Sequence, residues 1–265
     1  LFRALLPIVV GAETFLAAKE QSVALVFGEM PRMVPFTYAY TTEAMTGFGS
    51  IVIALSLSAL VLPLDVLMPV LVPLNLVLSG YLTLRYHRLV DWRLLLTGIL
   101  PMMAAGTLAG FLARPWLDQG IARPLFGALV VAFSVRELWR LRHATTVAAH
   151  GPWWSRFWML MAGLTHGLFA SGGPLLVYAL NGIRLDKGRF RATLVLVWFS
   201  LNSLLTLGFL ISGDLARQGG HLLALVPVVL LGIVLGEALH HRVDERRFRQ
   251  VLFTVLLLAG VALLA

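Results

Sequence analysis

The sequence predicts an all-α, polytopic membrane protein made of two inverted repeats, each with a broken re-entrant hairpin plus three transmembrane helices. Three observations lead to this prediction. The chain is too apolar to form one soluble core, most of its apolar segments have about the length that spans a bilayer, and its two halves contain matching motifs in the same order.

The composition places the chain in a membrane. Of its 265 residues, 59% are hydrophobic and only 13% are charged, and the mean hydropathy is +0.87. A soluble domain contains about 25% charged residues, so the excess apolar surface requires the hydrocarbon of a bilayer. The chain has no cysteine, which excludes disulfides, thiolate metal sites and cysteine nucleophiles.

The apolar segments follow one another along the chain, and most have about the 20 residues that a crossing helix needs. They are 35–62, 65–84, 92–113, 121–139, 154–182, 190–212, 221–239 and 248–265. The N-terminal stretch 1–34 contains several charges, including Arg3, Glu13 and Lys19. It is expected to form one helix that either crosses the membrane or lies in the interface.

The two halves of the chain repeat one another. The matching pairs, all in the same order, are Asp65 with Asp186, Asn75 with Asn202, Gly106 with Gly232, Gly110 with Gly236, Asp118 with Asp244, Arg123 with Arg249, and the segment 44–49 with 167–172. Chance does not readily give so many matches in order. The sequence therefore predicts two transport repeats, 35–140 and 154–265, joined by a basic linker, 141–153.

The distribution of basic residues predicts how the repeats are oriented. Loops 85–93, 183–191 and 240–249 are rich in Arg and Lys, as is the linker, whereas the intervening loops contain few. If basic loops are cytoplasmic, 154–182 begins and ends on the same side and must be a re-entrant hairpin. By the repeat, 35–62 is a hairpin with both ends outside. Seven crossings and two hairpins result, and inverted repeats with broken helices are typical of transporters.

Several of these motifs resemble the TauE/SafE sulfite exporter family, which includes permeases similar to the 4-toluene sulfonate uptake permease. They are the segments 46–49, 64–65, 91–93, 163–174 and 186–193, with the glycine-rich late helices. The resemblance covers about 35–265. It implies a secondary transporter, most simply an exporter, of small sulfur oxyanions such as sulfite, sulfoacetate or other C2 sulfonates. It also implies a multi-pass protein of the bacterial inner (plasma) membrane.

The breaks in the two hairpins are the candidate anion site. A half-helix that begins inside the membrane directs free backbone N–H groups and about half a positive charge toward a cavity. Glycine lets an anion approach that backbone closely. The candidate binding residues at the breaks are Thr46, Gly47, Gly49, Ser171, Gly172 and Gly173. The alternative is that these glycines only allow close helix packing, which we prefer for Gly106, Gly110, Gly232 and Gly236.

Further polar residues belong to the predicted site. Asn75 and Asn202 occupy matching positions, and each either binds sulfonate oxygens or ties the broken backbone. Glu43 and His166 also match one another, and ionisable groups at membrane depth are functional candidates. This pair is predicted to transfer a coupling proton, with His166 also as an anion ligand; the alternative is a structural hydrogen bond or a water-exposed position. Arg191 is either an anion ligand or a headgroup anchor.

Three other functions remain open from the sequence. An uncoupled anion channel would have the same cavity, and an uptake permease for sulfonates or small carboxylates would differ only in its gradients. A serine protease would use Ser171 and His166, although Phe169 stands where its motif requires glycine. The expected partners are a small anionic substrate and the lipid bilayer, with no nucleic acid, metal or cofactor. A homodimer is one candidate assembly.

Overall fold

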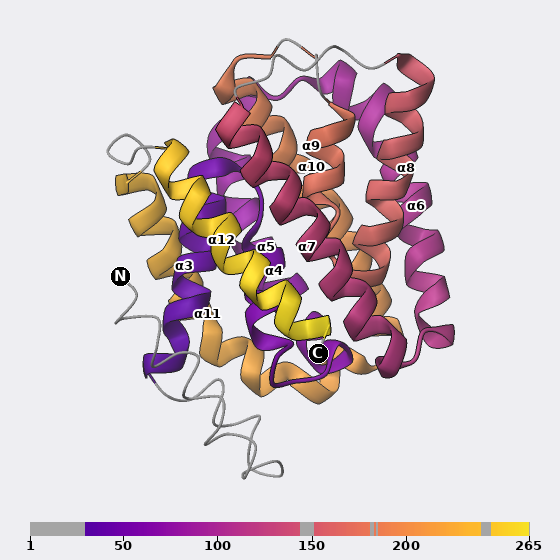
Figure 1. Ribbon diagram of the computed structural model, residues 1–265, viewed down its shortest axis with the longest axis vertical. Coiled ribbons are helices and arrows are strands. Elements are labelled where there is room, and N and C mark those ends of the chain that lie inside the picture. Colours follow the sequence, from indigo (N-terminus) through magenta and orange to yellow (C-terminus); the bar gives the residue numbers. More distant parts are fainter. Residues whose placement is uncertain (1–29, 144–150, 181–182, 184, 240–244, 265) are drawn as a thin grey trace.

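The computed structural model describes residues 30–143, 151–180, 183, 185–239 and 245–264. Figure 1 shows a bundle of helices, and the described residues contain no strand. This confirms the prediction of an all-α polytopic protein. Three helical spans, Leu64–Leu89, Leu94–Trp116 and Gly188–Ile211, are long and apolar enough to cross a membrane, and Leu225–Ala238 and Arg249–Leu264 are shorter apolar helices. Most of the predicted N-terminal helix in 1–34 lies outside the described residues.

The helices follow the predicted apolar segments closely. In the first half, the broken pair α3 (Met30–Thr46) and α4 (Ser50–Ser58) precedes α5 (Leu64–Tyr86), α6 (Leu100–Ala113) and α7 (Gln119–His143). In the second half, the broken pair α8 (Pro152–Phe169) and α9 (Gly173–Ala179) precedes α10 (Lys187–Ile211), α11 (Asp214–Leu239) and α12 (Glu245–Leu264). A π-helical turn, Leu94–Ile99, leads into α6, and short 3-10 turns follow α5 and α6 at His87–Leu89 and Arg114–Trp116.

The two breaks share one feature of backbone geometry, although Gly49 is left-handed (φ 110°) and its repeat equivalent Gly172 is right-handed (φ −74°). Gly47 and Ala170 both have a left-handed backbone, with φ of 85° and 52°. The N–H of Gly47 donates to the carbonyl of Glu43, and that of Ala170 donates to the carbonyl of His166. Ala170 is the one non-glycine residue with positive φ in the described chain, and such a conformation costs energy. This shared feature agrees with the sequence match between Glu43 and His166.

Helices from the two halves pack in reciprocal pairs. Figure 1 shows α3 beside α11 on one flank and α8 beside α6 on the other, while α5 packs on α10 and α7 on α12. The glycines of α11 face α3, because a Cβ on Gly232 would lie 2.7 Å from the Cβ of Tyr40. The glycines of α6 face α8 in the same way. This pattern agrees with two exchanged repeats, whose inversion relative to the bilayer stays a prediction.

The contact of α6 with α8 gives a stability prediction. A Cβ on Gly110 would overlap the carbonyl oxygen of Leu164 and lie 3.0 Å from the Cα of Gly167, so Gly110→Ala forces two backbones apart. We expect a loss of at least about 1–3 kcal/mol, the usual cost of overpacking, measured as a lower melting temperature in detergent. Gly151→Ala is the control, since nothing lies within 4 Å of its added Cβ. Equal melting temperatures for both variants would contradict the close packing.

The pairing of α7 with α12 gives a topology prediction. The helices run antiparallel, because Glu137 bonds Arg249 and Gly127 lies against Gly260 and Leu263. The end of α7 and the end of the chain should therefore lie on opposite faces, with the linker inside. Reporter fusions after residues 145 and 265 test this in cells. Signals from the same face would exclude the arrangement.

Candidate functional site

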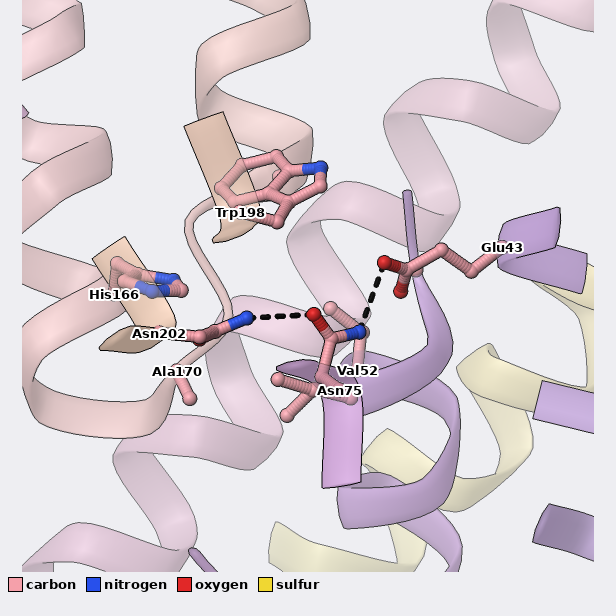
Figure 2. A pocket seen from close by; sticks show the side chains of 10 residues that line it. Glu43, Val52, Asn75, His166, Ala170, Trp198 and Asn202 are labelled. Carbon is pink, nitrogen blue, oxygen red and sulfur yellow. Dashed lines mark hydrogen bonds between the residues drawn. The ribbon is translucent and has the colours of Figure 1, made fainter. Parts of the chain in front are cut away.

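A small cavity lies between the two breaks (Figure 2). Its polar lining consists of Glu43, Asn75, His166, Trp198 and Asn202, and the breaks themselves contribute Gly49, Ala170 and Gly173. Its volume is about 20 Å³, which holds about one water molecule. The structure thus brings predicted residues of both halves to one place.

The first half of this site is already filled by a carboxylate of the protein. Glu43 is 2% exposed. Its Oε2 accepts the backbone N–H of Ser50 at 2.9 Å and the Ser50 hydroxyl, and its Oε1 accepts the amide of Asn75 at 2.8 Å. Ser50 begins α4, so the carboxylate occupies the helix N-terminus where an anion is favoured. The first break therefore holds a carboxyl group of the protein at the place that would favour an anion.

Two asparagines connect the halves. The Nδ2 of Asn202 donates to the Oδ1 of Asn75 at 2.7 Å, and the Nδ2 of Asn75 in turn donates to Glu43. Both asparagine side chains are 1% exposed. In this conformation Asn75 ties the first break together, since it also donates to the Ser50 hydroxyl at 2.9 Å. Figure 2 shows the resulting chain of hydrogen bonds, which runs from Glu43 across the cavity to Asn202.

The second half of the site has polar atoms without a complete hydrogen bond. His166 is 1% exposed. Neither of its ring nitrogens, nor the Oδ1 of Asn202, meets a described residue in full hydrogen-bond geometry, although the Asn202 side chain lies within interaction range of the His166 ring. The ring of Trp198 lies 5.6 Å from that of His166, while its N–H donates to the carbonyl of Gly47 at 3.0 Å. Buried polar groups are normally satisfied, so these atoms mark a position for a polar ligand.

Comparison with known proteins identifies the family of the chain. Residues 36–263 match the protein family described as Sulfite exporter TauE/SafE. The chain belongs to the TauE/SafE family. It is 28% identical over 180 residues to the Probable inner membrane transporter protein TsaS of Comamonas testosteroni, a match that covers 66% of this chain and 73% of that protein. No solved structure matches the chain. The family confirms the resemblance read from the sequence.

The other predicted residues at the breaks of this TauE/SafE chain shape the backbone. The hydroxyl of Thr46 donates to the carbonyl of Thr42 at 2.8 Å, and that of Ser171 donates to the carbonyl of Phe169 at 2.9 Å. A Cβ on Gly172 would overlap the carbonyl oxygen of Ala162. Hydroxyls of Ser and Thr commonly bond nearby carbonyls in this way. Neither hydroxyl is directed at the cavity in this conformation.

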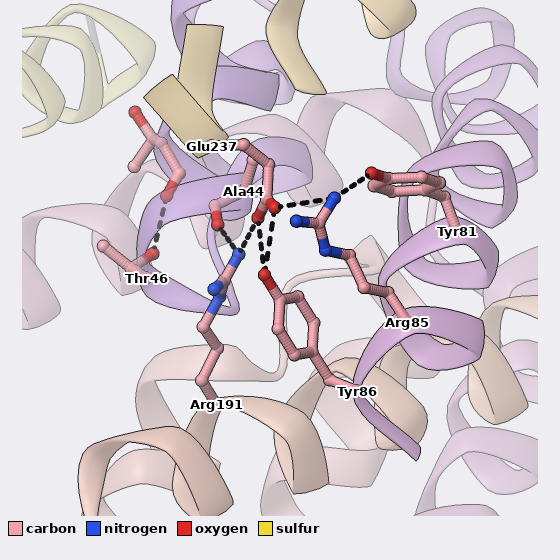
Figure 3. Close-up of polar contacts among 8 residues, drawn as sticks. Ala44, Thr46, Tyr81, Arg85, Tyr86, Arg191 and Glu237 are labelled. Atoms are coloured by element: carbon pink, nitrogen blue, oxygen red, sulfur yellow. Dashed lines mark hydrogen bonds and ion pairs between the residues drawn. The ribbon is translucent and has the colours of Figure 1, made fainter. Parts of the chain in front are cut away.

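Arg191 lies behind the first break, outside the cavity lining (Figure 3). Its Nη2 contacts Glu237 Oε1 at 2.9 Å and donates to the carbonyl of Ala44, near the C-terminus of α3. A cation at that end of a helix is favourable. Its guanidinium also lies 4.9 Å from the centre of the Tyr86 ring, and its side chain leaves no room for a Cβ on Gly47.

Sequence reasoning missed Glu237 and Tyr86. The Tyr86 hydroxyl donates to Glu237 at 2.9 Å, and Arg85 contacts the same carboxylate at 3.4 Å. One carboxylate thus joins α5, α10 and α11 beside the first break. The signal was present, because Glu237 follows Gly236 in an apolar segment, where an acidic residue requires a partner.

Proposed function

We propose that this TauE/SafE member is a secondary transporter that exports small sulfur oxyanions, such as sulfite, sulfoacetate or other C2 sulfonates, across a bacterial inner membrane. The observation that supports it most is the small cavity between two broken helices, lined on one side by buried polar atoms that meet no described residue in full hydrogen-bond geometry. The substrate is a small anion, the environment is a bilayer, and the chain acts without covalent chemistry or a cofactor.

We assign the anion to the half of the cavity formed by His166, Asn202 and Gly173. The equivalent place at the first break is taken by the Glu43 carboxylate, and two anions in a low-dielectric cavity repel one another strongly. His166 has an N–H to donate in either protonation state. A sulfonate oxygen beside it would satisfy a ring nitrogen that meets no described residue in full hydrogen-bond geometry.

The cavity is too small to hold the proposed substrate in this conformation. About 20 Å³ holds one water molecule, and a sulfonate head group, with its sulfur and three oxygens, is several times larger. Binding therefore requires the two breaks to separate, which is the movement expected of repeats that alternate access around a fixed site. The reciprocal packing of α3 on α11 and α8 on α6 allows each broken pair to move with its partner helix.

The hydrogen-bond chain provides a route for proton coupling through Glu43. All three observed partners of the carboxylate are donors, which suits its ionised form. Asn75 must then direct its amide nitrogen at Glu43 and its oxygen at Asn202. Consequently the amide nitrogen of Asn202 donates to Asn75. The amide oxygen of Asn202, an acceptor, then faces the cavity.

Protonation of Glu43 would reverse this polarity. A protonated carboxyl donates to an oxygen, so the amide of Asn75 turns over, and its nitrogen faces Asn202. The amide of Asn202 then turns in response and presents its N–H groups to the cavity. Anion binding is thereby favoured when Glu43 is protonated, and a protonated His166 adds attraction with the same sign. Proton and anion would then move together, so export would be driven by the outward concentration gradient of the anion and not by the inward proton gradient.

Three alternatives are distinguished by observation. A serine protease would need His166 within hydrogen-bond reach of the Ser171 hydroxyl, but that hydroxyl donates to Phe169. A channel would pass anions far faster than a carrier cycle allows. Uptake uses the same site with other gradients, since an inside-negative potential favours anion export by about 2.3 kcal/mol per 100 mV.

A binding panel on purified protein tests the function. We expect sulfite, sulfoacetate and isethionate to raise the melting temperature in detergent, with taurine, which is zwitterionic, much weaker. Sulfate and small carboxylates complete the panel. A response to none of the sulfur oxyanions would refute the proposed substrate class, and a response to carboxylates alone would favour the permease alternative.

A further inference from the structure

We propose that the arginines around Glu137 form a second oxyanion-binding site, from which the substrate enters the central cavity. We call Arg136, Glu137, Arg140 and Arg249 the Glu137 cluster. It lies near the end of α7 and the beginning of α12, on the face that the basic loops predict to be cytoplasmic. The proposal rests on the transport function above and adds a loading site to it.

The Glu137 cluster has more positive than negative charge. Arg140 and Arg249 contact the same Oε1 of Glu137, at 2.5 and 2.6 Å, so one carboxylate oxygen serves two guanidinium groups. Arg136 lies 4.5 Å over the ring of Tyr178 and forms no ion pair with a described residue. The cluster thus contains three guanidinium groups and one carboxylate. Guanidinium groups suit bidentate binding of oxyanions. A sulfonate has three oxygens that can accept hydrogen bonds, whereas Glu137 contacts both arginines through a single oxygen.

Three separate small cavities lie between this cluster and the central site. One cavity of about 10 Å³ is lined by Arg136, Glu137, Arg249 and Phe48. A second, of about 20 Å³, shares Arg249 and Phe48 with it and also has Gly49 in its lining, which is otherwise mostly apolar. Gly49 also lines the central cavity. Neighbouring cavities therefore share lining residues from the basic end of the bundle to the anion site, but they are not joined in this conformation.

Phe48 separates the two sites. It lies within the first break, and a Cβ on Gly173 would be 3.4 Å from its ring, so the ring rests against the second break as well. Separation of the breaks would move this ring aside and join the cavities. The anion would then move from the cluster into the central cavity. Glu137 would form its ion pairs with Arg140 and Arg249 again. Binding at the cluster depends on competition between the substrate and the Glu137 carboxylate.

An anionic lipid headgroup offers the same chemistry as a soluble oxyanion. We favour the soluble anion because a second cavity, which shares Arg249 and Phe48 with the cavity at the cluster, lies between the cluster and Gly49. The two sources are separated by lipid composition. A site for substrate works equally in vesicles of phosphatidylcholine and in vesicles that contain phosphatidylglycerol.

The decisive experiment measures sulfoacetate transport by Arg136→Gln from each face, in everted and right-side-out phosphatidylcholine vesicles. We expect KM for substrate on the cluster's face to rise about tenfold, the effect of about 1.4 kcal/mol, with an unchanged maximal rate from that face. KM from the opposite face should not change, but the maximal rate from that face should fall about tenfold, because the substitution must change the ratio of maximal rate to KM equally in both directions. Arg123→Gln is the matched control, since Arg123 is the repeat equivalent of Arg249 and its Nη2 donates to the carbonyl of Leu60, away from the cluster.

A second variant tests binding without transport. Glu137→Gln leaves Arg140 and Arg249 without their shared carboxylate, so sulfoacetate should raise its melting temperature more than that of the wild type. Equal shifts, a rise in KM of Arg136→Gln from both faces, a result equal to Arg123→Gln, or an effect seen only with phosphatidylglycerol would each overturn the loading site. If the wild type transports no sulfur oxyanion at all, the proposed function fails instead, which is a distinct outcome.

Discussion

Glu43→Gln should bind a sulfonate more tightly than the wild type does at about pH 8, a value above the reference histidine pKa. The introduced amide donates to Asn75 Oδ1 and its oxygen accepts from Ser50, so it imitates the protonated carboxyl permanently. The amide of Asn202 then presents its N–H groups to the cavity at every pH. Affinity is measured on purified protein by thermal shift or calorimetry.

The same variant should lose proton-driven transport. Since the introduced glutamine side chain cannot release a proton, an imposed pH gradient should no longer drive accumulation of sulfonate in vesicles, although exchange of bound for free anion continues. A Glu43→Gln protein that keeps gradient-driven accumulation would contradict a coupling role for this residue. The uncoupled, voltage-driven exporter would then be the better account.

Asn202→Ala should weaken sulfonate binding about 10–100-fold. The substitution removes the amide that faces the anion and leaves Asn75 Oδ1 buried without a donor, and a hydrogen bond to a charged group contributes about 1.5–3 kcal/mol. Affinity and counterflow should fall together at every pH.

Ser200→Ala is the control for this prediction. Ser200 lies on the same helix, α10, and its hydroxyl donates to the carbonyl of Leu196 within that helix. It should therefore bind sulfonate as the wild type does. If Asn202→Ala and Ser200→Ala have the same affinity, Asn202 is a structural link only.

The sequence predicted the helices well because the bilayer imposes a strong and local pattern. Each predicted apolar segment corresponds to an observed helix or broken pair, with ends that differ by a few residues. The boundary placed between 34 and 35 falls inside α3, which begins at Met30.

The site was predicted less completely, because it depends on contacts between distant residues. The repeat paired Glu43 with His166 and Asn75 with Asn202, and the structure brings all four together. The repeat did not predict that a carboxyl group would occupy the first half of the cavity and that no equivalent group would occupy the second half. That difference arises because Glu43 reaches the N-terminus of α4, whereas no described residue meets the ring nitrogens of His166 in full hydrogen-bond geometry.

The left-handed residue of the second break is not one of the glycines that the sequence pointed to. Glycine is the residue expected in the left-handed region, which favours Gly172 and Gly173 for that role. The structure uses Ala170 instead. Gly172 is required for another reason, since its missing Cβ lets the break approach the carbonyl of Ala162. Arg191 likewise found a partner, Glu237, that lies far away in the sequence.

The most direct test of the central claim is the pH dependence of sulfonate affinity from about pH 5 to pH 9, a range that spans the reference histidine pKa of about 6.5. Wild type, Glu43→Gln and His166→Gln are compared in purified protein. We predict that wild-type affinity weakens as the pH rises, that Glu43→Gln loses most of this dependence, and that His166→Gln binds more weakly at low pH. Three equal, flat profiles would contradict the account.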